Sequence, residues 1–159
     1  MIGECLESEQ LFEGTLLENI ATGRPNATFA NVKWAVENLG LTPFLKTLPN
    51  GYQTRIDPQG KKLPWSTVQK ILLARSIAIQ PKLLVLENIL EAMNPDEIIR
   101  IVDFLTHPDR PWTMVAVSSN HYLASKVDQI AVVQEGSVRA TGNYTELDSS
   151  LIPQISASA

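Results

Sequence analysis

The sequence predicts an α/β fold with a mainly parallel sheet, and three features of the chain point to it. Two continuous apolar runs, at 82–87 and 113–119, are typical of strands covered on both faces of a sheet. Two segments with apolar residues at helical spacing, at 28–39 and 66–79, alternate with those runs. The stretch 129–142 predicts an antiparallel hairpin at the edge of the sheet, with its turn at Glu135 and Gly136.

The N-terminal part is expected to begin with a short strand over 1–6. Residues 13–23 then predict a turn and a short helix that stops at Gly23. Thr28 is a suitable N-cap for the helix that follows, and Gly40 suits its C-terminal end. A further short helix over 42–48 and a turn-rich loop over 49–62 complete this part.

The remaining elements follow from capping and breaker residues. The helix over 66–79 is expected to stop before Pro81, which precedes the apolar strand. Asn94 as N-cap and Pro95 at the first helical position predict the next helix. A short helix is predicted over 121–127, and the tail 148–159, rich in Ser and Ala, is expected to be loose.

The composition excludes several classes of function. A net charge of -4 gives no electrostatic reason to bind nucleic acid or an anionic membrane surface. The single cysteine, Cys5, excludes an internal disulfide, and neither His107 nor His121 has a partner at metal-ligand spacing, so no metal site is expected. No apolar run reaches the roughly 18 residues that span a bilayer, and the N-terminus is unlike a signal peptide, so the chain is expected to be soluble.

Three blocks of sequence resemble the ATP-binding cassette of ABC transporters, most closely of the exporter type. "LFEGTLLENIATG" is similar to the block that follows the Q-loop in that family, and "DQIAVVQEGSVRATGNYTEL" to its C-terminal end. "LPWSTVQKILLARSIAIQPKLLVLEN" matches the spacing of the signature and Walker B segments. The resemblance runs from Ile2 to Leu147. It implies a P-loop NTPase-like (RecA-like) sheet with the P-loop strand absent, a partial cassette over 1–147 and a helical subdomain over about 15–80.

The family binds ATP through a P-loop that lies upstream of the Q-loop. The pattern GxxxxGK[ST] occurs nowhere in this sequence. We therefore expect the chain to be a piece that starts after the P-loop, because a parallel sheet without that strand would leave apolar surface open.

The positions that match the family's nucleotide-binding motifs carry other residues. The Q-loop glutamine, which helps to position Mg²⁺ and water in the family, is matched by Glu7. The Glu7 carboxylate can still contact a metal there. The alternative is that Glu7 is a solvated acidic residue of a loop without a role in binding. The signature Ser, two Gly and Gln are matched, in that order, by four other residues, Pro64, Trp65, Ser66 and Thr67. Proline has no N–H for a phosphate and tryptophan fills the space of a glycine, so we expect a helix here, capped by Ser66 or Thr67, without the phosphate grip.

The Walker B pair of the family, an Asp that holds Mg²⁺ and a Glu that acts as general base, is matched by Glu87 and Asn88. Glu87 is one methylene longer and remains a weak candidate for Mg²⁺. Asn88 cannot accept a proton, and Glu91 is the nearby substitute. The D-loop aspartate is matched by Asn94, which serves first as a helix cap.

The histidine that contacts the γ-phosphate in the family is matched by Ser119. His121 lies two residues later and is expected to point elsewhere from the start of a helix. His107 is in a loop. No catalytic position of the family is therefore intact in this chain.

These substitutions favour a degenerate, non-hydrolytic part of an ABC exporter with a structural or regulatory role. Two alternatives stay open. One is an ATPase subunit active through a P-loop outside this chain or through a partner cassette, and the other is an interaction module without a nucleotide. Enzymatic activity of the complete protein is undecided, and the chain alone is expected to be inactive.

The resemblance also implies partners, a cofactor and a place in the cell. It implies Mg-ATP as a cofactor of the complete protein and none for this chain. The expected partners are a membrane domain, fused or separate, and a second cassette in a homo- or heterodimer, with no nucleic acid. The location implied is the cytoplasmic side of a membrane.

Overall fold

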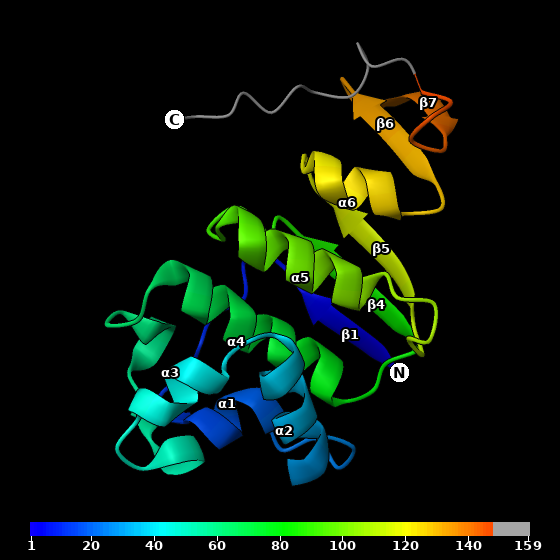
Figure 1. Ribbon diagram of the computed structural model, residues 1–159. Coiled ribbons are helices and arrows are strands. Elements are labelled where there is room, and N and C mark those ends of the chain that lie inside the picture. Colours follow the sequence, from blue (N-terminus) through cyan, green and yellow to red (C-terminus); the bar gives the residue numbers. More distant parts are fainter. Residues whose placement is uncertain (148–159) are drawn as a thin grey trace.

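The computed structural model of the protein describes residues 1–147, and three parallel strands form its central sheet (Figure 1). Strands β1 (Ile2–Cys5), β4 (Leu83–Glu87) and β5 (Thr113–Val117) are hydrogen-bonded in the order β1-β4-β5. Both pairs are parallel. The α/β class and the strands expected at 1–6, 82–87 and 113–119 are thereby confirmed, and the tail 148–159 lies outside the described residues.

The helices and the C-terminal hairpin follow the predicted order along the chain, whereas the short strands Gly14–Thr15 and Arg55–Ile56 were not predicted. The helices are α1 (Leu16–Ala21), α2 (Phe29–Asn38), α3 (Thr42–Thr47), α4 (Trp65–Ala78), α5 (Pro95–Leu105) and α6 (His121–Lys126). Short strands β2 (Gly14–Thr15) and β3 (Arg55–Ile56) form an antiparallel pair, as do β6 (Ile130–Gln134) and β7 (Ser137–Gly142). Two short 3₁₀ turns, η1 (Gly51–Gln53) and η2 (Pro58–Gly60), lie in the loop predicted over 49–62.

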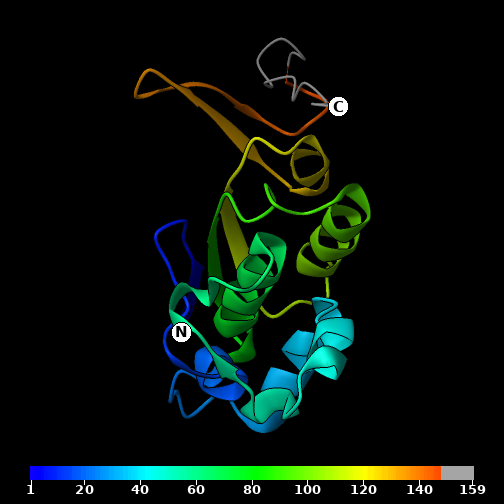
Figure 2. The ribbon, with the colours of Figure 1, turned by 90° about the vertical axis from the view of Figure 1, so that its left-hand side faces the viewer.

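Within residues 1–147, helices cover only one face of the central sheet. Helices α4 and α5 lie on the same side of it (Figures 1 and 2), where Leu84 and Leu86 of β4 are buried. On the other face Ile2, Val115 and Val117 are 50%, 53% and 62% exposed. The expectation that the apolar runs are covered on both faces is therefore wrong for residues 1–147. These residues supply no second layer of helices on the other face of the sheet.

Helix α4 is the centre of the hydrophobic core. It packs on β1 on one side and on α1 and α2 on the other, which explains why most of its side chains are buried all round. Gly3 makes the close approach to β1 possible, since a Cβ atom there would lie 2.3 Å from the carbonyl oxygen of Ser76. The approach of β1 to the last turn of α4 thus depends on the absence of a side chain at Gly3.

The N-terminal helices begin at side-chain caps. Thr15 and Glu18 form a capping box at the start of α1, and the Thr28 hydroxyl accepts the N–H of Asn31 at the start of α2, as predicted. Helix α1 ends at Ala21, two residues before the expected Gly23, because its C-cap Thr22 already adopts the left-handed conformation with φ 49°.

The C-terminal elements begin with α5, for which the predicted cap is confirmed. The Asn94 side chain accepts the N–H of Glu97, and Glu97 returns the bond to the N–H of Asn94. In the hairpin, Glu135 and Gly136 have φ 49° and 73°, as a tight two-residue turn requires. Among residues 1–147, β6 and β7 pair only with each other, so the hairpin does not extend the edge of the central sheet as expected.

Candidate functional site

The carboxyl ends of β1 and β4 bring three of the predicted residues together. Glu7 follows β1 by two residues, Glu87 ends β4, and Asn88 comes next. Because Cys5 pairs with Leu86 in a parallel register, both chains leave the sheet at the same edge. This edge is where ligands usually bind in open α/β sheets, so Glu7, Glu87 and Asn88 define a candidate strand-end site.

Hydrogen bonds connect these residues directly. The backbone N–H of Glu7 donates to Oε2 of Glu87 at 3.2 Å, and Nδ2 of Asn88 donates to Oε2 of Glu7 at 3.5 Å. Gln69 of α4 donates from Nε2 to the carbonyl oxygen of Asn88 at 3.4 Å. The polar groups at the end of β4 are therefore engaged with the segment after β1 and with α4.

The backbone of Asn88 is held in an uncommon conformation. Its φ is 51°, in the left-handed region, and its N–H donates to the carbonyl oxygen of Val117 at 3.0 Å. Asparagine tolerates this region better than most residues with a side chain. The residue at 88 thus suits the turn that follows β4, and its amide cannot act as a proton acceptor.

Other predicted residues do not join this cluster. Among the described residues, no hydrogen bond or ion pair connects Glu91 or Ser119 to Glu7, Glu87 or Asn88, and both side chains are exposed. His107 lies in the loop before β5, with Nδ1 3.6 Å from a carboxylate oxygen of Asp109. His121 is the first residue of α6. Within residues 1–147, neither Glu91 nor Ser119 is thus bonded to the residues of the strand-end site.

The start of α4 differs from the predicted capping. Pro64 is the N-cap residue, with φ -56° and no side-chain hydrogen bond, and the helix starts at Trp65. Ser66 and Thr67 lie inside the first turn, so the expectation that one of them caps the helix is wrong. The reason is that Pro64 already has the extended backbone of an N-cap, and its carbonyl oxygen accepts the N–H of Thr67 at 2.9 Å.

This helix start differs from the glycine-rich segment of the family that binds phosphate. Pro64 has no N–H, the N–H of Thr67 is used within the helix, and Thr67 is buried. Trp65, the first residue of the helix, is 52% exposed and places a large side chain where the family has a glycine. This segment therefore offers fewer backbone donors and less space for a phosphate than a glycine-rich helix start does.

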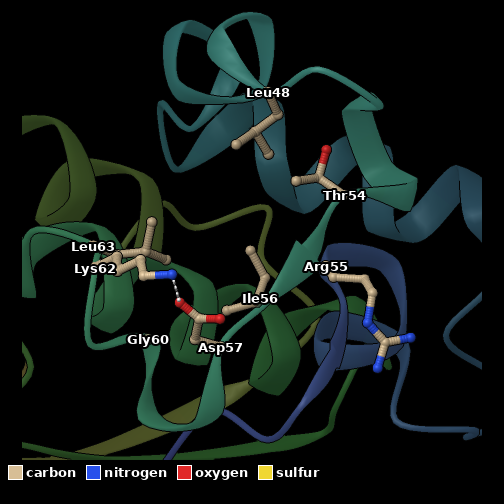
Figure 3. A pocket seen from close by; sticks show the side chains of 8 residues that line it. All are labelled: Leu48, Thr54, Arg55, Ile56, Asp57, Gly60, Lys62 and Leu63. Carbon is tan, nitrogen blue, oxygen red and sulfur yellow. Dashed lines mark ion pairs between the residues drawn. The ribbon is translucent and has the colours of Figure 1, made fainter.

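A small hollow precedes this segment, on the side of the 3₁₀ turns. Its volume is about 210 Å³, and its lining comprises Leu48, Thr54, Arg55, Ile56, Asp57, Gly60, Lys62 and Leu63. Figure 3 shows Lys62 reaching Asp57 in an ion pair of 3.0 Å, while the Arg55 guanidinium extends away from them. Arg55 pairs instead with Glu13 at 3.2 Å. The hollow shares no residue with the strand-end site.

The sequence motifs did not point to three residues of α4 that lie near the strand-end site or hold its surroundings. Gln69 contacts Asn88, and Lys70 forms a buried ion pair with Glu97 at the start of α5. Arg75 donates to the carbonyl oxygens of Asn19 and Gln10 at 2.8 and 3.2 Å, and so holds the segment after β1 on α4. A signal for Lys70 and Arg75 was present, since both are cations within an otherwise apolar helix.

Burial around Arg75 shifts the titration of its neighbours. Glu9 lies 3.6 Å from Arg75, and desolvation raises the pKa of its carboxyl even though Arg75 lowers it in part. Desolvation also lowers the pKa of Arg75 and raises the pKa of the Cys5 thiol to about 12. Cys5, Glu9 and Arg75 are thus coupled through their charges in a partly buried cluster.

Two properties concern the described residues as a whole. No helix within residues 1–147 has the length and apolar character needed to cross a membrane. In the same residues, no group of three or more His, Cys, Asp or Glu side chains is placed to hold a metal ion.

The chain is similar to known proteins over most of its length. No family model matches. The chain is 33% identical over 146 residues to "ABC transporter B family member 19" of Arabidopsis thaliana, covering 92% of this chain and 12% of the relative. It is 32% identical over 146 residues to the "Fatty acid ABC transporter ATP-binding/permease protein" of Mycobacterium tuberculosis, covering 92% of this chain and 23% of the relative.

The fold is also similar to that of a solved structure. The match is to a bacterial Atm1-family ABC exporter with ATP bound, with a TM-score of 0.82 and 24% identity over 91% of this chain. The aligned part is 25% of that exporter chain. This chain therefore spans about a quarter or less of the length of the relatives that it matches.

Proposed function

We propose that this chain forms a non-hydrolytic part of an ABC transporter. The premise is that the chain is a homologue of ABC exporter ATP-binding/permease proteins over 92% of its length. Its role would be structural or regulatory. The observation that carries the proposal is the strand-end site, where the amide of Asn88 donates to the Glu7 carboxylate. An amide offers no basic group to activate water.

The start of α4 supports the same proposal. Pro64 supplies no N–H to a triphosphate, the N–H of Thr67 is bonded within the helix, and Trp65 adds a large exposed side chain between them. Mg-ATP would be used by the complete protein only through residues outside this chain or in a partner.

The uncovered face of the central sheet supports a function inside a larger protein. A parallel sheet is normally covered on both faces, and here Ile2, Val115 and Val117 are half or more exposed. The matched relatives are four or more times longer than the aligned region. We propose that residues 1–147 are a partial cassette, with a helical subdomain over about 15–80, covered by other parts of the transporter.

The proposed partners follow from the printed names of the relatives. One relative combines an ATP-binding part and a permease part in one protein. For this chain, we propose a membrane domain, fused or separate, and a second cassette as partners. Its place would be the cytoplasmic side of a membrane.

A second candidate is an ATPase in which the strand-end carboxylates still act. Glu7 and Glu87 both reach the edge of the sheet, and the Glu7 N–H donates to Glu87. Two carboxylates can contribute to a hydrated Mg²⁺ site if a P-loop from elsewhere holds the nucleotide. Activity of this kind would depend on Glu87 or on Glu91.

Phosphate release from the purified complete transporter, in the presence of Mg-ATP, tests these two functions. We expect Glu87→Gln and Glu91→Gln to leave any steady rate unchanged, as should the exposed control Glu37→Gln. A rate that either substitution abolishes, while Glu37→Gln retains it, would establish the ATPase and overturn the non-hydrolytic role.

A further inference from the structure

Arg110 lies on an aromatic cluster at the end of the sheet opposite the strand-end site. It is located three residues before β5 begins, whereas Asn88 contacts the last residue of that strand. The Arg110 guanidinium carbon lies 4.6 Å from the ring centroid of Phe104 and 5.9 Å from that of Trp34. Both distances are within the range of cation–π contacts.

The aromatic cluster is a rigid support for this guanidinium. The ring centroids of Trp34 and Phe104 are 5.5 Å apart, and Trp112 packs against both at 6.4 and 6.1 Å. Trp112 is buried and donates its indole N–H to the carbonyl oxygen of Leu105 at 3.0 Å. A guanidinium stacked on such a cluster loses little further freedom when it binds a ligand.

The charge of Arg110 has no counterpart in the part of the chain that the structure describes. No carboxylate among residues 1–147 lies within ion-pair distance of its guanidinium, and no side-chain hydrogen bond from it is formed there. The neighbouring Asp109 faces His107 instead, at 3.6 Å. Because Nε is enclosed by protein, the two terminal nitrogens are the donors available to a ligand.

These donors border an open hollow of about 450 Å³. Its lining comprises Asn31, Trp34, Gln80, Asp109, Arg110 and Pro111. The side-chain amides of Asn31 and Gln80 add polar groups to its wall. The hollow is shallow and wide open to solvent, so it suits a side chain presented on a segment of polypeptide better than an enclosed small molecule.

The charges of the hollow select the kind of anion. A guanidinium matches a carboxylate with two parallel hydrogen bonds. The Asp109 carboxylate in the lining is 86% exposed, so its repulsion is weakened by solvent, but it disfavours a doubly charged phosphate more than a singly charged carboxylate. We propose that the hollow beside Arg110 binds a carboxylate side chain of an acidic peptide segment from a partner protein. This binding is independent of the function proposed above.

Titration of the 159-residue chain with a capped peptide of six glutamates tests the proposal. Binding is followed by tryptophan fluorescence and by the NMR signals of the Arg110 side chain. We expect saturable binding that shifts those signals. Arg110→Gln should raise the Kd by about tenfold or more, which is the effect of losing one charged hydrogen-bonded pair. Arg110→Lys, which keeps the charge without the planar fork, should raise it by less.

The controls separate this site from general electrostatics. Arg139→Gln makes the same change of charge on the exposed hairpin and should leave the Kd within about twofold. Equal weakening by Arg139→Gln, or binding of a six-glutamine peptide with the same Kd, would overturn the proposal. So would binding of acetate or inorganic phosphate as tight as that of the peptide. If Arg110→Gln fails to fold, the wild-type NMR titration decides, and unshifted Arg110 signals at saturation overturn it.

Discussion

The ammonium nitrogen of Lys70 lies 2.5 Å from Oε1 of Glu97, and this ion pair joins α4 to the first turn of α5. The two side chains are 9% and 20% exposed. Glu97 also accepts the N–H of Asn94 at 3.2 Å, so the same carboxylate caps α5 and binds α4. Helix α4 is thereby joined to the start of the helix that follows β4.

Removal of Lys70 should destabilise the fold. Lys70→Met keeps the length of the side chain but leaves the Glu97 carboxylate without its partner in a largely enclosed place. We expect the free energy of unfolding in urea to fall by about 1–3 kcal/mol, less than for a fully buried pair because Glu97 is partly exposed. The exposed pair of Lys33 and Glu37, 3.9 Å apart, provides the control, and Lys33→Met should cost less than about 0.5 kcal/mol. Equal losses for the two variants would contradict the role given to Lys70.

Acid should remove the contribution of Glu97 to stability. The hydrogen bond from Lys70 is the main cause that lowers the pKa of Glu97 below its ordinary value of 4.5. The unfolded chain therefore binds this proton more readily than the folded chain, and the contribution is complete above pH 4.5. It is lost as the pH falls from there through the lowered pKa of the folded state.

The stability difference between wild type and Glu97→Gln measures this loss. In urea unfolding it should stay constant from pH 7 to about pH 5 and shrink below about pH 4.5. Glu37→Gln, on the exposed face of α2, corrects for the general effect of acid. A difference that instead grows as the pH falls would mean that the sign assigned to Glu97 is wrong.

The left-handed backbone of Asn88 predicts an order of stability among substitutions. Asn88→Ala and Asn88→Gly both remove the bond to Glu7, but only alanine places a Cβ atom at φ 51°. We expect the alanine variant to be less stable than the glycine variant by about 1 kcal/mol. At Asn38, in the last turn of α2, the order should be reversed because glycine weakens helices. Thermal unfolding of the four variants compares the two positions.

The Cys5 thiol should be unreactive in the folded protein. It is 2% exposed, and burial raises its pKa to about 12, so little thiolate forms at pH 8. We expect dithiobis(nitrobenzoate) to react about 100-fold or more slowly with the folded chain than with the chain in denaturant. The variant Cys5→Ala with Ser137→Cys, which moves the thiol to an exposed strand, should react rapidly in both states. Rapid reaction of Cys5 in the folded chain would refute its burial.

The components of the strand-end site could be predicted, but not their contacts. The resemblance of the motifs pointed to Glu7, Glu87 and Asn88 separately. Glu7 and Asn88 are 81 residues apart, and they meet because β1 and β4 pair in one parallel register. No local pattern contains that register. Lys70 and Glu97 are likewise 27 residues apart, and their ion pair depends on how α4 packs against α5.

The sequence by itself determined the order of the helices and of the longer strands, because these depend on neighbours within a few residues. Apolar periodicity defined α2, and the caps at Thr28 and Asn94 act over three residues. The tertiary structure alone decided what lies beside each element. It left one face of the sheet uncovered within residues 1–147, set the hairpin apart from β5, and enclosed Lys70 with Glu97. The physical reason is that burial and pairing join segments distant in sequence, so their partners are established only when the chain is packed.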